Sequence, residues 1–159
     1  MELIEKILSE ENLQKAIRRV KKNKGAPGVD KMTVQEVEEW FNQYKEDLIS
    51  KILNKQYKPM PVKRVYIPKP NGKQRPLGIP TVVDRVIQQA MLQVLSEIYE
   101  SVFSEHSYGF RPNRSAHMAM EEVLGYLNDG YEWIVDLDIE KFFDTVNHDK
   151  LISILRERV

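Results

Sequence analysis

The sequence contains no cysteine, which excludes disulfide bonds and zinc sites built on thiolates. It has three histidines, which lie too far apart to form a ligand pair at helical spacing: His106, His117 and His148. It also lacks a long apolar run, and its acidic start differs from a signal peptide. We therefore expect a protein of the reducing cytoplasm that has no membrane partner.

The formal net charge is zero, but the two halves of the chain carry opposite charges. Residues 1–80 have 17 Lys and Arg against 10 Asp and Glu, whereas residues 81–159 have 7 against 14. Within residues 51–80 there are eight basic residues and no acidic one. This split predicts that one part holds an anionic polymer and the other holds metal ions. The alternative for 51–80 is a chance cluster of basic residues on a solvated surface.

The spacing of apolar residues predicts a helix-rich α+β fold. Helical periodicity is found over residues 2–22, 33–53, 82–99, 116–127 and from about 149 onward. Thr33 is predicted to cap the second of these segments, with Glu36 as its capping-box partner. Thr81 is predicted to cap the third.

Residues 62–67 and 74–79 are predicted to be the strands of a β-hairpin. The Asn71-Gly72 pair between them is typical of hairpin turns. Lys69 and Arg75 flank the turn, where a lysine point charge and an arginine fork suit phosphate oxygens. The alternative is an edge strand that positive charge keeps soluble.

A third strand is predicted over residues 133–139, where two carboxylates interrupt an apolar run. Side chains alternate along a strand, so Asp136 and Asp138 share one face. Oxygen ligands at such a strand end suit a hard divalent cation, which often keeps phosphates as its other ligands. This arrangement is typical of phosphoryl or nucleotidyl transfer. An EF-hand is excluded, because Lys141 and Asn147 stand where that loop needs Gly and Glu.

Four motifs in series resemble those of bacterial group II intron-encoded reverse transcriptases. They are the loop Gly25 to Asp30, the hairpin Tyr66 to Pro80 with Asp84-Arg85-x-x-Gln88 after it, the block Tyr108-Gly109-Phe110-Arg111-Pro112-x-Arg114, and Val135 to Asp144. The motifs follow the order of that family and cover essentially the whole chain. The resemblance therefore implies reverse-transcriptase fingers with a β-hairpin plus the first part of the palm, a truncated right-hand polymerase.

The resemblance also implies a division of the chain into three parts. Residues 1–32 are the N-terminal extension, 33–85 are fingers with the basic hairpin at 62–79, and 86–159 are finger and palm helices. The last part includes the first palm strand, at 133–139, and an incomplete palm.

The activity that the resemblance implies is addition of dNTPs to a DNA primer on an RNA template, the intron RNA, with two Mg²⁺ ions. Asp138 is then the first catalytic aspartate, and the Ile139 carbonyl is a metal ligand beside it. The dNTP site is formed by Lys69, Arg75, Phe142 and Phe143, with the Phe143 ring as the steric gate against a ribose 2′-OH and Phe142 buried. Asp136 receives no role.

Nucleic-acid contacts are implied for the remaining basic residues and for apolar residues of the hairpin: Lys63, Arg64, Pro68, Leu77, Ile79, Pro80, Arg85, Arg111 and Arg114. Contacts of this kind to phosphates depend on salt and not on base sequence. Arg111 and Arg114 have an alternative structural role, which is pairing with Glu105, Glu121 or Glu122.

The sequence lacks the second palm motif of the family, a Tyr-x-Asp-Asp turn. We therefore expect a fragment that does not polymerise alone, taken from a protein that also acts as a splicing maturase. Two alternatives stay open, a non-catalytic RNA-binding maturase module and a retron or diversity-generating reverse transcriptase. The sequence is also compatible with a homodimer.

Overall fold

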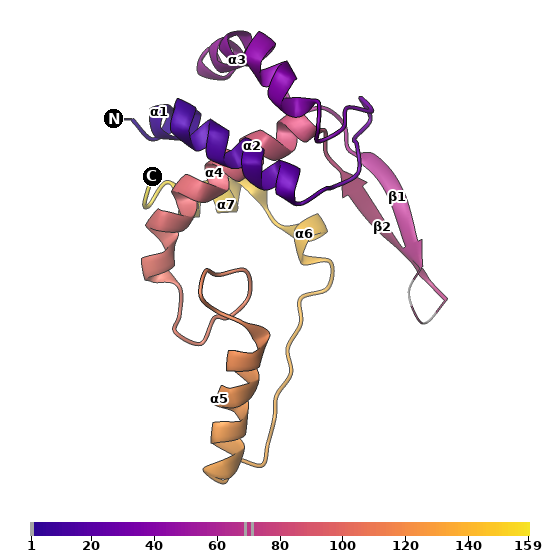
Figure 1. Cartoon of the computed structure of the whole chain (residues 1–159). Coiled ribbons are helices and arrows are strands. Elements are labelled where there is room, and N and C mark those ends of the chain that lie inside the picture. The colour runs from indigo at the N-terminus through magenta and orange to yellow at the C-terminus, as the bar shows by residue number, and fades with distance from the viewer. Residues whose placement is uncertain (1, 69, 71) are drawn as a thin grey trace. The chain divides into compact units, whose positions relative to one another are not determined.

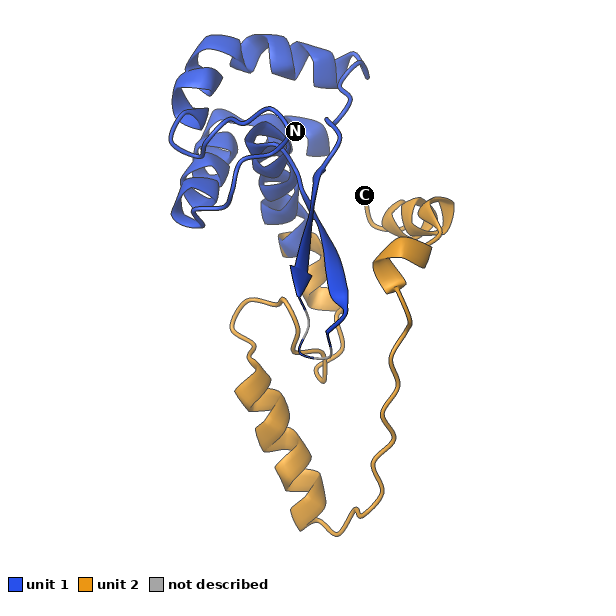
Figure 2. Ribbon diagram, turned by 90° about the vertical axis from the view of Figure 1, so that its right-hand side faces the viewer, with its two compact units in different colours: residues 1–96 blue, residues 97–159 orange. Residues whose placement is uncertain are grey.

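The computed structural model describes residues 2–68, 70 and 72–159 (Figure 1). The chain divides into two compact units, residues 1–96 and 97–159 (Figure 2), and each is described by itself. Among the described residues, no helix combines the length and the apolar character that a membrane span needs.

The N-terminal unit is helical with one hairpin, as the predicted α+β class requires. Its elements are α1 (Leu3–Leu8), α2 (Glu10–Lys22), α3 (Val37–Leu53), β1 (Lys63–Pro68), β2 (Gln74–Ile79) and most of α4 (Val82–Tyr99). Ser9 ends α1 with an extended backbone, and its hydroxyl then accepts a hydrogen bond from the Asn12 amide in the first turn of α2. The segment 2–22 is therefore two helices, one of the two outcomes that its sequence predicts.

The core of the N-terminal unit lies between α2, α3 and α4. Each helix contributes one apolar stripe, in which Leu13 and Ile17 come from α2, Phe41 from α3, and Val86 and Ala90 from α4. All five side chains are buried, and burial of such stripes is what stabilises short helices in water. This core supports the hairpin at the start of α4.

Helix α3 begins later than its sequence predicts. The Glu36 side chain does accept hydrogen bonds from the Thr33 amide at 2.8 Å and from the Thr33 hydroxyl at 2.6 Å. The helix nevertheless starts at Val37 with Glu36 as its N-cap, because residues 34–36 form turns. The Thr33–Glu36 contact therefore belongs to the turn before α3.

The loop before α3 lies unusually close to the start of α4. A Cβ atom on Gly28 would lie 2.7 Å from the Thr81 Cα and 3.0 Å from the Pro80 carbonyl oxygen. A Cβ atom on Gly25 would lie 2.3 Å from a terminal nitrogen of Arg85. Glycine at both positions permits this approach, which the sequence pattern did not predict.

The C-terminal unit contains the end of α4, a 3₁₀ turn at Glu100–Val102, α5 (Ala116–Asn128), α6 (Phe142–Thr145) and α7 (His148–Leu155). No residue of 97–159 is buried. The exposed side chains include large apolar ones, such as Trp133 at 93% and Leu137 at 89%. This unit therefore has no core of its own.

The strand predicted over 133–139 does not form, and that prediction is wrong for this chain. Residues 131–139 have no regular secondary structure, and the sheet found among the described residues consists of β1 and β2 alone. A strand requires a neighbour for its N–H and C=O groups. No such neighbour reaches 133–139, so its alternating side chains remain exposed on both sides.

Candidate functional site

The hairpin presents two faces whose residues follow from its register. The strands are antiparallel, and Val65 lies opposite Leu77, Ile67 opposite Arg75, and Lys63 opposite Ile79. Side chains alternate between faces, so these pairs share one face. That face has an apolar centre, with Leu77 41% exposed, and a basic residue at each end. The register thus brings four of the predicted contact residues together: Lys63, Arg75, Leu77 and Ile79.

The opposite face carries a different set of residues. Arg64 lies opposite Gly78, Tyr66 opposite Pro76, and Pro68 opposite Gln74. The Tyr66 ring is 58% exposed. The predicted contacts Arg64 and Pro68 therefore lie apart from Lys63 and Arg75. Sequence reasoning passed over Tyr66, although its alternation with Ile67 could have placed it beside Arg64.

The tip of the hairpin is described only in part. Lys69, predicted to bind the dNTP, lies outside the described residues. Arg75 is exposed, and no hydrogen bond or ion pair joins its side chain to the described part of the chain. Its guanidinium is therefore available for a phosphate group.

Arg85, which the sequence predicts to contact nucleic acid, has a structural role in the N-terminal unit. Its Nη2 atom donates a hydrogen bond of 2.7 Å to the Ala26 carbonyl, and so fastens the glycine-containing loop to α4. The Nε atom is buried without a hydrogen-bond partner in the described residues. Burial lowers the pKa of Arg85, against the opposing effect of Asp30. Pro80, also predicted to contact nucleic acid, is half-buried under this loop.

Arg111 is held by four contacts within the C-terminal unit. Its Nη2 and Nε atoms lie 2.8 and 3.1 Å from Glu100 Oε1, and Nη1 donates to the carbonyls of Ser104 and Ser107. The side chain is 8% exposed. These contacts favour the structural role for Arg111, although with Glu100 and not with the glutamates that the sequence pointed to.

Arg114 belongs to a neighbouring cluster around Glu122. The Arg114 guanidinium lies 5.5 Å from the centre of the Tyr108 ring. The Glu122 carboxylate accepts hydrogen bonds from Tyr108 and Tyr126 and pairs with His106. These partners, Tyr108 first, lower the pKa of Glu122, and Glu122 in turn raises the pKa of Tyr108. The cluster attaches the loop before α5 to that helix.

Asp138 lies in the irregular segment and is exposed. Neither a hydrogen bond nor an ion pair joins its carboxylate to the rest of the described chain, so it is not a helix cap. Carboxylate and carbonyl oxygens, such as those of Asp138 and Ile139, are the donors that a hard divalent cation takes. No group of three His, Asp or Glu side chains within the described residues could hold a metal ion. The donors present therefore fit part of a metal site and require further ligands.

A short turn of helix follows Asp138. Lys141 has a left-handed backbone with φ 51° and serves as the N-cap of α6. A non-glycine residue in this conformation is uncommon and directs the chain sharply. The rings of Phe142 and Phe143 meet edge to face at 5.4 Å. Phe142 is 48% exposed and Phe143 is 89% exposed, so the expectation of a buried Phe142 is wrong, although Phe143 is the more accessible ring.

Comparison with known proteins gives a consistent set of matches. Residues 67–158 match the family model described as reverse transcriptase (RNA-dependent DNA polymerase). The chain is 41% identical to Protein YkfC of Escherichia coli strain K12, over 99% of this chain and 43% of that protein. It is 38% identical to the group II intron-encoded protein LtrA of Lactococcus lactis subsp. cremoris, over 91% of this chain and 24% of that protein.

A shorter match is to Nuclear intron maturase 2, mitochondrial, of Arabidopsis thaliana, at 38% identity over 48% of this chain and 10% of that protein. The chain spans less than half the length of each of these three relatives. The residues matched by the family model include Arg75, Asp138 and Phe143.

Proposed function

Because the chain belongs to the reverse transcriptase (RNA-dependent DNA polymerase) family, we propose that it supplies the fingers and first palm segment of a group II intron-encoded reverse transcriptase and maturase. The reaction is addition of dNTPs to a DNA primer on an RNA template. The proposal extends to a cytoplasmic location and to intron RNA as the template. The observation that carries it is the accessible Asp138 carboxylate inside the region that the family model matches.

Asp138 is the proposed catalytic aspartate. Its carboxylate and the Ile139 carbonyl would hold divalent cations, proposed to be two Mg²⁺ ions, together with oxygens from the nucleotide and from the rest of the palm. Such cations stabilise the charge on the attacking and leaving oxygens of a nucleotidyl transfer. The support from this chain is that the Asp138 carboxylate makes no hydrogen bond or ion pair with any other described residue.

The hairpin is the proposed binding element for the anionic substrates. Arg75 neutralises and orients the triphosphate of the incoming dNTP, as an arginine fork does for phosphate oxygens. Lys63 and Arg64, on opposite faces, contact backbone phosphates, while Leu77 and Ile79 offer apolar surface to the templating base. The exposure of both faces supports this division of roles.

Phe143 is the proposed steric gate. Its ring fills the space that a ribose 2′-OH would occupy, and the 2′-OH is what distinguishes a ribonucleotide from a deoxynucleotide. The high exposure of Phe143 supports this role, since a gate must reach the substrate. Phe142 contacts it edge to face.

The C-terminal unit is proposed to gain its core from further palm structure. A backbone segment without strand partners and a helix with exposed apolar residues would both be covered by additional strands. The greater length of the relatives supports this proposal. The 159-residue chain alone should give no primer extension, because the Tyr-x-Asp-Asp turn is not in its sequence.

The proposal is tested in a protein that joins this chain to the remaining length of its relatives. Asp138→Asn should abolish primer extension with dNTPs and Mg²⁺, while binding of the primer–template duplex changes little. Asp129→Asn is the matched control, since Asp129 is an exposed aspartate at the end of α5. Extension by the Asp138→Asn protein at the parental rate would refute the catalytic assignment.

The second candidate is an RNA-binding maturase module without polymerase activity. Its support is that the hairpin presents exposed basic residues on both faces, Lys63 and Arg75 on one and Arg64 on the other. It predicts that Asp138→Asn leaves splicing and RNA binding intact and that the parent protein extends no primer. The same experiment therefore separates the two candidates.

A further inference from the structure

We propose that Asp84 is a positioning residue that sets the orientation of the β1–β2 hairpin by clamping both of its ends to α4. The structural part of this proposal depends only on the N-terminal unit. Its consequence for nucleotide addition rests on the proposed function.

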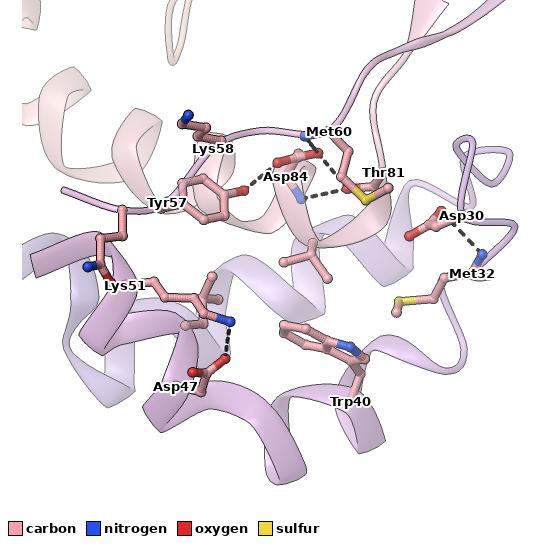
Figure 3. Close-up of a pocket in the computed structure, with 13 residues that line it drawn as sticks. Asp30, Met32, Trp40, Asp47, Lys51, Tyr57, Lys58, Met60, Thr81 and Asp84 are labelled. Atoms are coloured by element: carbon pink, nitrogen blue, oxygen red, sulfur yellow. Dashed lines mark hydrogen bonds and ion pairs between the residues drawn. The ribbon is translucent and has the colours of Figure 1, made fainter. Parts of the chain in front are cut away.

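The Asp84 carboxylate accepts three hydrogen bonds from residues that flank the hairpin (Figure 3). Tyr57 donates its hydroxyl to Oδ1, while the Met60 amide and the Thr81 hydroxyl donate to Oδ2 at 3.2 and 2.6 Å. Tyr57 and Met60 precede β1, and Thr81 follows β2. One side chain near the start of α4 therefore holds the chain where it enters the hairpin and where it leaves.

The clamp is a buried carboxylate whose partners are neutral donors. Asp84 is 5% exposed and Thr81 is 2% exposed. Hydrogen bonds to an ionised acceptor are stronger than neutral ones, and a buried carboxylate that loses a donor retains its desolvation cost. Burial and the contact with Asp84 raise the pKa of Tyr57, so its hydroxyl keeps the proton that it donates.

The base of the hairpin borders a cavity on one side. This cavity of about 540 Å³ lies beside the clamp and is lined by Trp40, Lys51, Tyr57 and Met60 among others (Figure 3). Within the strands, only Val65 and Ile79 are half-buried, and a two-stranded hairpin is marginally stable by itself. The three hydrogen bonds to Asp84 therefore contribute to the attachment of the hairpin, together with the packing of Gly28 on Pro80 and Thr81.

A small tilt at the base of the hairpin, where Asp84 holds it, displaces the tip by several ångströms. Each strand has six residues, which corresponds to a length of about 20 Å. A tilt of about 10° at the base would move the tip by roughly 3.5 Å over that length. Displacements of about 1 Å at a reacting centre can cost a hundredfold in rate. The orientation that Asp84 sets therefore decides whether Arg75, near the tip, reaches its phosphate.

The experiment measures the orientation of the hairpin directly. Because the chain has no cysteine, Gln74→Cys and Lys15→Cys together place one spin label near the tip and one on α2. Distances between the labels are recorded by double electron–electron resonance on the whole chain, well below its melting temperature. The compared backgrounds are the parent, Asp84→Asn, Tyr57→Phe and the control Tyr44→Phe, whose exposed ring lies beside Trp40.

We expect Asp84→Asn and Tyr57→Phe to broaden the distance distribution, and Tyr44→Phe to leave it unchanged. Loss of one hydrogen bond to a charged group should raise the population of displaced hairpin about tenfold. An Asp84→Asn protein that is folded and has the parental distribution would overturn the proposal. If Asp84→Asn fails to fold, the test rests on Tyr57→Phe, which removes only one oxygen atom. A folded Tyr57→Phe protein with the parental distance distribution would then overturn the proposal.

A merely structural Asp84 would lower the melting temperature without changing the distribution in the folded state. In the protein with the remaining palm, Tyr57→Phe should raise the KM for dNTPs by up to about tenfold, in proportion to the competent fraction that is lost, and change kcat less. If that protein polymerises nothing, the proposed function fails while the distance measurement still stands. If it polymerises with an unchanged KM, the positioning role fails and the proposed function stands.

Discussion

Replacing Gly28 by alanine tests the close approach between the N-terminal loop and the start of α4. The new Cβ atom would lie 2.7 Å from the Thr81 Cα, 2.9 Å from its nitrogen and 3.0 Å from the Pro80 oxygen. Carbon atoms in contact ordinarily lie about 3.5–4.0 Å apart, so the backbone must move by roughly 1 Å. Thr81 cannot yield freely, because it is buried and bonded to Asp84.

The expected cost follows from two opposing effects. Overpacking of this kind costs about 1–3 kcal/mol. Alanine also reduces the entropy of the unfolded chain, which returns about 0.4–1 kcal/mol where the backbone suits it. The net destabilisation is then roughly 1.3 kcal/mol, within a range of about 0–2.6 kcal/mol, and each kcal/mol lowers the melting temperature of a unit of this size by about 4–8 °C.

Thermal unfolding followed by far-ultraviolet circular dichroism measures this change. The control is Gly125→Ala in α5, where a Cβ atom would meet nothing within 4 Å. That change should not lower stability, because alanine favours a helix by about 1 kcal/mol over glycine. A Gly28→Ala protein that melts at or above the parental temperature would refute the reasoning on close approach.

The other predictions concern Arg111, Glu122 and Arg64. Arg111→Ala should lower the free energy of unfolding of this region by about 2 kcal/mol, because it leaves Glu100 and two backbone carbonyls unpaired. Hydrogen exchange of the amides over 104–111 should become faster. The pKa of Glu122 in the folded state lies below its ordinary value of 4.5. The ionised carboxylate therefore stabilises the fold above pH 4.5, and this contribution is lost as the pH falls through the lowered pKa. The protection of amides in the loop before α5, relative to their intrinsic exchange rate at each pH, should therefore fall on acidification, and Glu122→Gln should remove that dependence. Arg64→Ala should weaken binding to a primer–template duplex and reduce its salt slope by about one, whereas Lys51→Ala, whose amine pairs with Asp47, should not.

The features predicted correctly from the sequence are those fixed by neighbouring residues. The hairpin at 63–79 and the Thr81 cap of α4 depend on local turn and cap chemistry, and both form. The strand at 133–139 depends on a partner strand that these residues do not contain. Arg85 shows the same limit, since its partner, the Ala26 carbonyl, is 59 residues away along the chain.

The candidate site divides in the same way. Alternation along the strands could have assigned Lys63 and Arg64 to opposite faces, since it needs only the register. The clamp on Asp84 could not be found from spacing, because a buried aspartate at the start of a helix is ordinarily a cap. Only the fold brings Tyr57 and Met60 to it.

All residues described as buried lie within the first 96 positions, so the part of the chain that has a core is synthesised first. Domains generally fold from the N-terminus during synthesis, at about 5–20 residues per second. The 63 residues from Glu97 to Val159 then take roughly 3–13 seconds to translate. On the ribosome, the N-terminal unit and its basic hairpin can therefore begin to form before the whole C-terminal unit has been synthesised.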